Sequence, residues 1–347
     1  MPINPSGEFS FDSRHVWKLA TDRKMLDLNN RPQDFAHRMS KVTVGVCVKN
    51  CADLVGEAIS SIVSQDFPHE LIEVIFVDDG SEDNTLSIIQ EYLPKIDMLV
   101  RIFHHEWKGL GLSRNVVVDN AQGEYIVWVD GDMRLSKDFV RRQVEYMEGN
   151  PATGIGKGKY SMSTQANLVS ELENIEFASV NLRRERKAGA TPLGTGGSIY
   201  RIKAIRQVGG FDEKITGSGE DQDIEHRISA VGWALDLTSA VFYETRRKTL
   251  RSLWNEYFWH GTGGSYLFEK NMKIVGPYKF WPPVMITIEL LRVRMAYRAT
   301  HRKLALLLPI LYVFKRTAWL FGFVVGRLET KKTKKNAIDY INHVRTS

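Results

Sequence analysis

Residues 125–132 read Tyr-Ile-Val-Trp-Val-Asp-Gly-Asp, and the prediction of the fold starts from them. The five apolar residues are typical of a buried strand. Asp130 and Asp132 follow one residue apart, and residues i and i+2 of an extended backbone share a face. Both carboxylates therefore project toward one point, where their repulsion favours a bound cation. A hard divalent ion with oxygen ligands, shared with a diphosphate, suits such a site. An isolated pair of this kind is more often only a polar turn.

Strands and helices are predicted to alternate on the amino-terminal side of this segment. Apolar and β-branched runs predict strands at residues 42–48, 72–77 and 99–103. Helical spacing of apolar residues predicts helices at 54–65, 85–93 and 115–121. This alternation indicates βαβ units in an α/β fold with a mostly parallel sheet and flanking helices, and ligands at the carboxyl edge of that sheet.

Two polar turns are expected at the same edge. Asp78 and Asp79 follow the strand at 72–77 and can accept from a base N–H or a ribose hydroxyl, while Ser81 or Asp83 caps the next helix. The loop at 108–115 brings two glycines and an arginine to a helix start, which suits phosphate. An ordinary helix entry explains this second loop about as well.

A second group of motifs lies beyond residue 190. The run 194–198, Gly-Thr-Gly-Gly-Ser, indicates a backbone that approaches a ligand closely or has positive φ. Asp221 stands at a glycine-loosened helix entry and can act as a general base, oriented by Arg227 or by a backbone N–H. Alternatively, Glu220 and Asp221 only complement the helix dipole.

Composition limits the classes of protein to consider. The 347 residues, 43% of them apolar, can form one large α/β domain with an appendage, or two modest domains. Cys47 and Cys51 are too few for a disulfide framework or a zinc site, so reduced thiols in a cytosolic enzyme are expected. The first residues lack a basic segment leading into an apolar core, so a secretory signal is not expected.

The carboxyl-terminal part is strongly basic and apolar. From Lys270 onward there are 16 Lys and Arg residues against three acidic ones. Residues 304–326 are long enough to span a bilayer, but Lys315 and Arg316 interrupt them and Pro309 breaks the helix. We therefore expect two short helical pieces lying in an anionic membrane interface, with Trp281, Tyr312 and Trp319 at headgroup depth. The alternatives are packing on the globular domain or a dimer interface, and a spanning helix is least favoured. Nothing further supports nucleic-acid binding.

Taken in order, six motifs resemble those of the family 2 glycosyltransferases, which are inverting enzymes of the GT-A fold. They are V-D-D-G-S-x-D-x-T, K-G-x-G-x-S-R-N, G-E-Y-I-x-W-x-D-G-D, G-T-G-G-S-x-x-R, G-G-F-D-E and G-E-D-Q-D-x-x-x-R, and the resemblance covers roughly residues 41–265. It implies a nucleotide-diphospho-sugar donor and Mg²⁺ or Mn²⁺ as cofactor.

The resemblance also implies a role for each matching residue. Asp78 and Asp79 would hold the base and ribose, and Arg114 would lie near the ribose and diphosphate. Asp130 and Asp132 would bridge the metal ion, and Asp221 would be the catalytic base. Further donor contacts are expected from Gly196 and Gly197, and a third metal ligand from His260 or, in its place, Glu244. The Q-x-x-R-W motif of processive members is absent, because residues 258–264 read Phe-Trp-His-Gly-Thr-Gly-Gly, so polymer synthesis is not expected.

These observations predict three regions: an amino-terminal extension (1–40), a GT-A catalytic domain (41–265) and a basic, apolar helical membrane-associated region (266–347). The expected enzyme is a metal-dependent hexosyl- or N-acetylhexosaminyltransferase at the cytoplasmic face of the membrane. Its acceptor would be a polyprenyl lipid or a growing glycan. One alternative is a non-catalytic nucleotide-sugar-binding or scaffold subunit of a membrane complex. Another is a soluble transferase whose tail forms a dimer interface.

Overall fold

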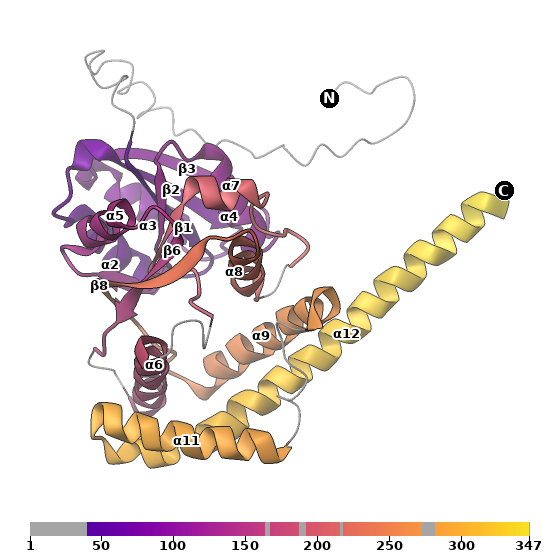
Figure 1. Ribbon diagram of the computed structural model, residues 1–347. Helices are drawn as coiled ribbons and strands as arrows, with labels where there is room; N and C mark the ends of the chain where they lie inside the picture. Colours follow the sequence, from indigo (N-terminus) through magenta and orange to yellow (C-terminus); the bar gives the residue numbers. More distant parts are fainter. Residues whose placement is uncertain (1–39, 164–166, 187–191, 216–217, 273–281, 347) are drawn as a thin grey trace.

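The computed structural model describes residues 40–163, 167–186, 192–215, 218–272 and 282–346. Nearly all of the expected amino-terminal extension lies outside these residues, as does Trp281. The described chain forms an eight-stranded sheet in the order β3-β2-β1-β4-β7-β6-β8-β5, with helices packed around it (Figure 1).

The first half of the sheet confirms the predicted alternation. It consists of the parallel strands β1 (Val42–Val48), β2 (Ile72–Asp79), β3 (Leu99–His105) and β4 (Tyr125–Trp128). The helices between them are α2 (Ala52–Val63), α3 (Thr85–Tyr92) and α4 (Leu110–Asn120). Helix α4 starts five residues before its predicted position, because Gly109 adopts a φ of 99° and turns the chain directly into the helix.

The second half makes the sheet mixed, so the prediction of a mostly parallel sheet holds for the first half only. It contains β5 (Met133–Leu135), β6 (Thr153–Tyr160), β7 (Ser198–Arg201) and β8 (Ala234–Glu244). Strand β7 runs antiparallel to both β4 and β6, while β6 and β8 are parallel. The helices of this half are α5 (Phe139–Gly149), α6 (Leu168–Arg186), α7 (Ile202–Gln207) and α8 (Glu220–Ala230).

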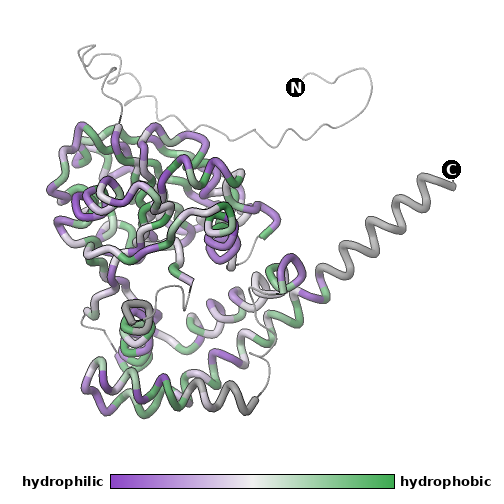
Figure 2. Tube along the Cα trace, in the orientation of Figure 1, coloured by the Kyte–Doolittle hydropathy of each residue, from purple (hydrophilic) through white to green (hydrophobic). Residues whose placement is uncertain are grey.

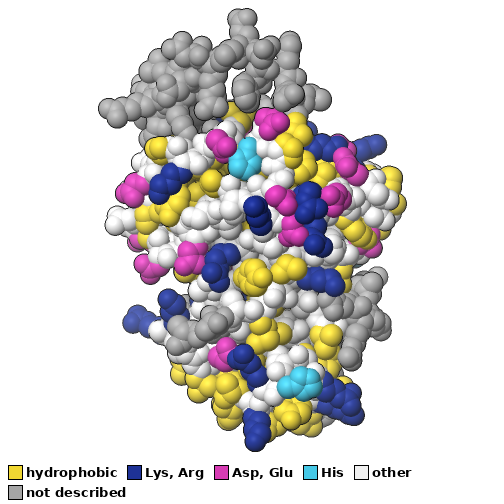
Figure 3. Space-filling view, turned by 90° about the vertical axis from the view of Figure 1, so that its left-hand side faces the viewer, with side chains coloured by type: hydrophobic (Ala, Val, Ile, Leu, Met, Phe, Trp, Pro, Cys, Tyr) yellow, Lys and Arg dark blue, Asp and Glu magenta, His cyan; other side chains and the backbone are white. Residues whose placement is uncertain are grey.

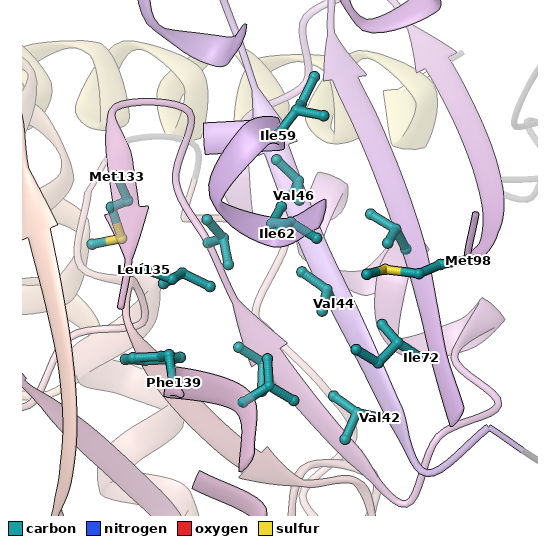
Figure 4. Packing of buried hydrophobic residues seen from close by; sticks show 14 of the residues in the cluster. Val42, Val44, Val46, Ile59, Ile62, Ile72, Met98, Met133, Leu135 and Phe139 are labelled. Atoms are coloured by element: carbon teal, nitrogen blue, oxygen red, sulfur yellow. The ribbon is translucent and has the colours of Figure 1, made fainter. Parts of the chain in front are cut away.

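The core lies on both faces of the sheet. Val42, Val44 and Val46 alternate along β1 toward one face, where they meet Ile59 and Ile62 of α2 (Figure 4). Residues of β2 divide between that cluster and a second one on the opposite face. Full burial of each such side chain stabilises the fold by about 1.5–3 kcal/mol. The parallel strands are therefore fixed, and so are the turns at their carboxyl ends.

The carboxyl-terminal helices are α9 (Leu250–Lys270), α11 (Pro282–Thr300) and α12 (Leu308–Thr346), with a short 3-10 helix at Lys303–Leu307 before α12. The prediction of two short apolar pieces is wrong, because α12 is one continuous helix (Figures 1 and 2). Pro309 lies in its first turn, where the missing N–H costs no helical hydrogen bond. The predicted boundary between residues 265 and 266 falls inside α9.

Helices α9 and α12 lie side by side along a seam of glycines (Figure 1). A Cβ added at Gly261 would overlap the carbonyl oxygen of Trp319, and one at Gly322 would overlap that of Phe258. Such close backbone approach leaves no room for any side chain at these two positions. The seam therefore fixes α12 against α9.

Candidate active site

Asp79 ends β2 at the carboxyl edge of the parallel strands. Its Oδ1 accepts a hydrogen bond from the Lys108 backbone N–H at 2.9 Å and lies 3.4 Å from His105 Nδ1. Burial raises the pKa of Asp79, and the Lys108 N–H and the charges of His105 and Lys49 oppose that rise. The turn thus presents an acidic acceptor beside the loop that leads into α4.

Asp78 is more fully engaged within the protein. Its Oδ2 lies 2.7 Å from His104 Nδ1, and its Oδ1 accepts from the Ser81 hydroxyl. As expected, Asp83 accepts a hydrogen bond at the start of the next helix, from the backbone N–H of Thr85 in α3 at 3.0 Å. It also accepts one from the backbone N–H of Ala52. The internal contacts of Asp78 shape the turn, and its role in donor binding stays a prediction.

Arg114 brings together acidic residues from distant parts of the chain. It projects from α4, is buried, and donates to Glu220 at the start of α8. Its Nη2 also lies 3.8 Å from Asp130 Oδ1, and its guanidinium packs near the rings of Trp128 and Phe211. Because a buried guanidinium holds carboxylates in a fixed geometry, Asp130 and the first turn of α8 are placed at one site.

Asp130 and Asp132 leave β4 in a turn closed by the Met133 N–H, which donates to the Asp130 carbonyl at 3.0 Å. The Asp130 side chain is 40% exposed and that of Asp132 is 18% exposed. Burial, followed by the charges of Glu244 and Asp130, raises the pKa of Asp132 to about 8. Such mutual repulsion between oxygen donors fits a divalent cation, which would relieve it.

The predicted three-residue metal set is not assembled. In the residues that the structure describes, no group of three His, Cys, Asp or Glu side chains has the spacing of a metal site. His260 lies on α9, where burial lowers its pKa and its acidic neighbours are Glu256 and Asp221. Glu244 is the acidic neighbour of Asp130 and Asp132 instead, and Arg246 pairs with it at 2.8 and 3.0 Å. The carboxylate pair alone is the candidate protein ligand set.

The loop at 194–197 lies against this pair. A Cβ added at Gly196 would overlap the Asp130 carboxylate, and Gly197 has a φ of 70° with the ring of Phe242 at 2.7 Å from its virtual Cβ. Buried Lys157 donates to the carbonyls of Gly194 and Gly196. The predicted positive φ is confirmed at Gly197, and Gly196 approaches a carboxylate of the protein, while the predicted contact of both glycines with the donor stays a prediction.

Asp221 occupies the first turn of α8, after Gly219, whose φ is 112°. The Gln222 backbone N–H donates to Asp221 Oδ1 at 2.7 Å. Of the two partners expected for Asp221, the structure has the backbone N–H, whereas Arg227 pairs with Asp223 and the Val208 carbonyl. Residues i and i+4 share a helix face, which explains why Arg227 selects Asp223.

Several residues of the site escaped prediction. The sequence predicts for Glu220 only a favourable charge at a helix start, whereas in the structure Glu220 is the buried partner of Arg114, and burial raises its pKa to about 7. Glu225 accepts from the N–H groups of Leu193 and Gly194, so it fixes the start of the glycine loop. Lys157 was detectable in principle, since a lysine inside the buried glycine-rich strand Thr153–Tyr160 needs partners.

Comparison with known proteins places this arrangement in context. Residues 43–209 match the model of glycosyl transferase family 2. The chain is 33% identical over 110 residues to the poly(ribitol-phosphate) β-N-acetylglucosaminyltransferase TarS of Staphylococcus aureus, covering 32% of this chain and 19% of that protein. It is 26% identical over 249 residues to the poly-β-1,6-N-acetyl-D-glucosamine synthase of Staphylococcus epidermidis, covering 68% and 55%. The chain thus spans about half or less of the length of these relatives.

Among solved structures, the mannosyltransferase PcManGT from Pyrobaculum calidifontis, in complex with GDP-Man and Mn²⁺, superimposes with a TM-score of 0.55. The match covers 88% of this chain and 93% of that one at 20% sequence identity. A likeness at this identity bears on the fold alone, and it confirms the GT-A fold class.

Proposed function

Because the chain belongs to glycosyl transferase family 2, we propose that it moves a sugar from a nucleotide-diphospho-sugar to an acceptor hydroxyl or phosphate with inversion at the anomeric carbon. The group transferred is a hexosyl or N-acetylhexosaminyl residue. The acceptor is a polyprenyl lipid or a growing glycan at the cytoplasmic face of the membrane.

One observation carries the proposal. Arg114 holds Asp130 of the β4–β5 turn and Glu220, the neighbour of Asp221, at the same carboxyl edge where Asp79 ends β2. Residues from four separate segments therefore meet where α/β folds bind their ligands. Asp79 then faces the base and ribose, and Asp130 faces the diphosphate.

The chemical step uses the first turn of α8. Asp221 accepts the proton of the acceptor hydroxyl as the oxygen attacks the anomeric carbon from the face opposite the departing diphosphate. The Gln222 N–H orients one carboxylate oxygen of Asp221 and leaves the other, Oδ2, for the acceptor. Arg114, held by Glu220, supplies fixed positive charge near the leaving group. A single displacement needs no second carboxylate as nucleophile.

A divalent cation fits the Asp130 and Asp132 carboxylates, as their repulsion indicates. Mg²⁺ or Mn²⁺, when bound there, neutralises charge on the departing nucleoside diphosphate. The Mn²⁺ in the complex of PcManGT is consistent with this cofactor.

Substitutions at the two acidic positions test the chemistry. Asp221→Asn should abolish sugar transfer while donor binding, measured by calorimetry with Mn²⁺, changes less than about threefold. Asp132→Ala should weaken Mn²⁺-dependent donor binding, and exposed Asp97→Asn is the matched control for both. Unchanged turnover in Asp221→Asn would show that the base is misplaced. Donor binding without any turnover by the wild-type protein would favour the non-catalytic alternative.

The membrane part of the proposal is supported by an exposed apolar face. Along α12 and the short helix before it, exposed side chains recur at helical spacing: Leu306, Ile310, Val313, Phe321, Val324 and Leu328. Exposed cations flank this face at Arg294, Arg298, Arg302 and Lys303. Figure 3 shows apolar and basic side chains together at the lower end of the molecule, over the carboxyl-terminal helices. An anionic membrane surface complements such a face.

An interfacial position suits α12 better than a spanning one. The segment Lys303–Glu329 is long and apolar enough to cross a membrane. Its opposite side, however, packs along α9, and Lys315 pairs there with Glu173 and Glu176 of α6. A spanning α12 would therefore carry an ion cluster and a catalytic-domain helix into hydrocarbon, at high cost.

Liposome flotation of the full chain tests this part. The wild type should float with anionic vesicles, and Ile310→Glu/Val324→Glu should not. Val231→Glu, an exposed valine on the catalytic domain, is the control and should float as the wild type does. If both variants float, or if neither floats, the result counts against docking through α12. Sedimentation equilibrium would then test the dimer alternative.

A further inference from the structure

A groove on the side of the catalytic domain is lined by hydroxyl groups, and the mechanism above does not use it. It runs between helix α2 and the strands β5 and β8 at one edge of the sheet, and α2 and β8 lie close together at the left of Figure 1. Its volume is about 520 Å³, within the range of about 300–1,000 Å³ that is typical of ligand sites. Its lining includes Gly56, Ser60, Ser64, Tyr92, Arg134 and Tyr243.

The α2 side of the groove consists of small polar residues at helical spacing. Gly56, Ser60 and Ser64 follow one another at intervals of four residues, so they share one side of the helix. The Ser60 hydroxyl donates to the Gly56 carbonyl at 2.8 Å, and the Ser64 hydroxyl donates to the Ser61 carbonyl at 3.1 Å. Each hydroxyl oxygen therefore keeps its lone pairs for a ligand that donates hydrogen bonds.

Gly56 makes room for a phenol at the groove. A Cβ added at Gly56 would lie 2.9 Å from the Tyr92 hydroxyl oxygen. Glycine inside a helix costs about 1 kcal/mol relative to alanine, and here it allows the hydroxyl of Tyr92 to lie against α2. The ammonium of Lys95 lies 4.4 Å from the centroid of the same ring and helps to hold it. Tyr92 thus presents a fixed hydroxyl that can both donate and accept.

The opposite side of the groove carries Arg134 and the half-buried Tyr243. The two residues are register partners in β5 and β8, so their side chains are neighbours on one face of the sheet. Arg134 Nε lies 3.5 Å from Glu57 Oε2 of α2, and both side chains are exposed. A guanidinium that donates and a carboxylate that accepts therefore stand side by side, and their charges balance.

We propose that this groove binds a neutral oligosaccharide, namely the part of a glycan acceptor that lies behind its reacting end. The inference rests on the proposed function and selects the glycan from its two acceptor classes. Sugar hydroxyls both donate and accept, which matches the hydroxyls of the groove and the pair of Glu57 and Arg134. The ring of Tyr243 can pack against the C–H face of a sugar. A polyprenyl chain would instead leave these polar groups without partners.

The groove adjoins the proposed reacting centre without containing it. Arg134 is two residues beyond Asp132, a separation that spans at most about 7 Å. Tyr243 precedes Glu244, whose charge acts on Asp130 and Asp132. A glycan held along α2 therefore has one end near the carboxylate pair.

Ligand-observed NMR on the full chain tests the groove, with EDTA present and nucleotide absent. The probes are linear hexasaccharides of glucose, mannose and N-acetylglucosamine. At least one should bind the wild type with a Kd below about 1 mM, and its monosaccharide at least tenfold more weakly. Ser60→Leu fills the groove and should weaken hexasaccharide binding at least tenfold, whereas Ser87→Leu, at an exposed serine of α3, is the matched control and should bind as the wild type does. Tyr243→Ala should weaken binding about tenfold, and Tyr243→Phe should retain affinity within about threefold.

The outcomes separate this inference from the proposed function. Failure of every hexasaccharide to bind the wild type, or unchanged affinity in Ser60→Leu, would overturn the groove and leave a transferase with a lipid acceptor standing. Hexasaccharide binding without sugar transfer from any donor would overturn the proposed function and leave the groove. In the transfer assay, Ser60→Leu should lower kcat/KM for a hexasaccharide acceptor at least tenfold more than for a monosaccharide acceptor. An equal loss for both acceptors would overturn the groove.

Discussion

Replacement of Lys315 by methionine tests how the carboxyl-terminal helices are held to the catalytic domain. Lys315 is 2% exposed, and its Nζ lies 2.8 Å from Glu173 and 2.7 Å from Glu176, both on α6. The ammonium also lies 4.6 Å from the centroid of the Tyr257 ring on α9. One cation of α12 therefore joins three helices. Methionine keeps much of the apolar stem and removes only the charge.

The expected cost follows from the burial of the two partners. Glu173 is as buried as Lys315, and Glu176 is 18% exposed. Removing one member of a buried ion pair typically costs 3–5 kcal/mol, because an uncompensated charge remains. Burial already raises the pKa of Glu173 even beside Lys315, so that carboxyl can take up a proton and limit the penalty. We therefore expect Lys315→Met to lower the free energy of unfolding by about 3 kcal/mol.

Urea denaturation followed by circular dichroism measures this loss. Lys303→Met, an exposed cation just before α12, is the control and should change stability by less than about 0.5 kcal/mol. The triple variant Lys315→Met/Glu173→Gln/Glu176→Gln should recover most of the loss, because no buried charge remains unpaired. A single variant as stable as the control, or a triple variant no better than the single one, would refute the reasoning.

Three further perturbations test other parts of the structure. Gly322→Ala should destabilise the protein by about 1–3 kcal/mol in urea denaturation because its methyl group overlaps α9, whereas Gly149→Ala, with open space around it, should stabilise it slightly. Lys157→Met should raise the donor KM by releasing the carbonyls of the glycine loop, and an unchanged KM would remove Lys157 from donor positioning. Burial raises the pKa of Glu225 to about 7, so its folded-state protonation favours the native state at pH 5 and this contribution disappears as pH rises through 7. The free energy of unfolding of the wild type should therefore fall by up to about 3 kcal/mol from pH 5 to pH 8. In Glu225→Gln the same pH change should produce a smaller decrease.

The sequence predicted those parts of the fold whose signal is local. A buried parallel strand needs a continuous apolar run, so residues 42–48 and 72–77 were assigned to strands that the structure confirms. The turns after these strands follow directly, because each strand must end in polar residues at the same edge. Asp79 and Asp130 were located in this way.

What the sequence did not predict depends on contacts between distant segments. Arg114 and Glu220 are 106 residues apart, and nothing near either residue indicates the other. The insertion of β7 between β4 and β6 likewise depends on the three-dimensional path of the chain. The continuous α12 could not be predicted for a different reason. A proline breaks a helix only when it lies in the helix interior, and the sequence alone does not show that α12 starts at Leu308, which puts Pro309 in the first turn.

Helix α9 connects the proposed membrane face to the proposed base. A Cβ at Gly263 would overlap the backbone of Ser218, in the loop before α8, while one at Gly261 would overlap α12. Residues two apart are separated by about 200° around a helix, so these contacts lie on opposite sides of α9. With α12 on the membrane surface, the glycine seam sets the distance between the lipid and the loop that contains Ser218 and leads to Asp221. An acceptor hydroxyl must then reach Asp221 at that distance from the lipid. A substitution in the seam, such as Gly322→Ala, should then impair transfer to a lipid-linked acceptor more than transfer to a soluble one, and equal impairment of both would argue that α9 only stabilises the fold.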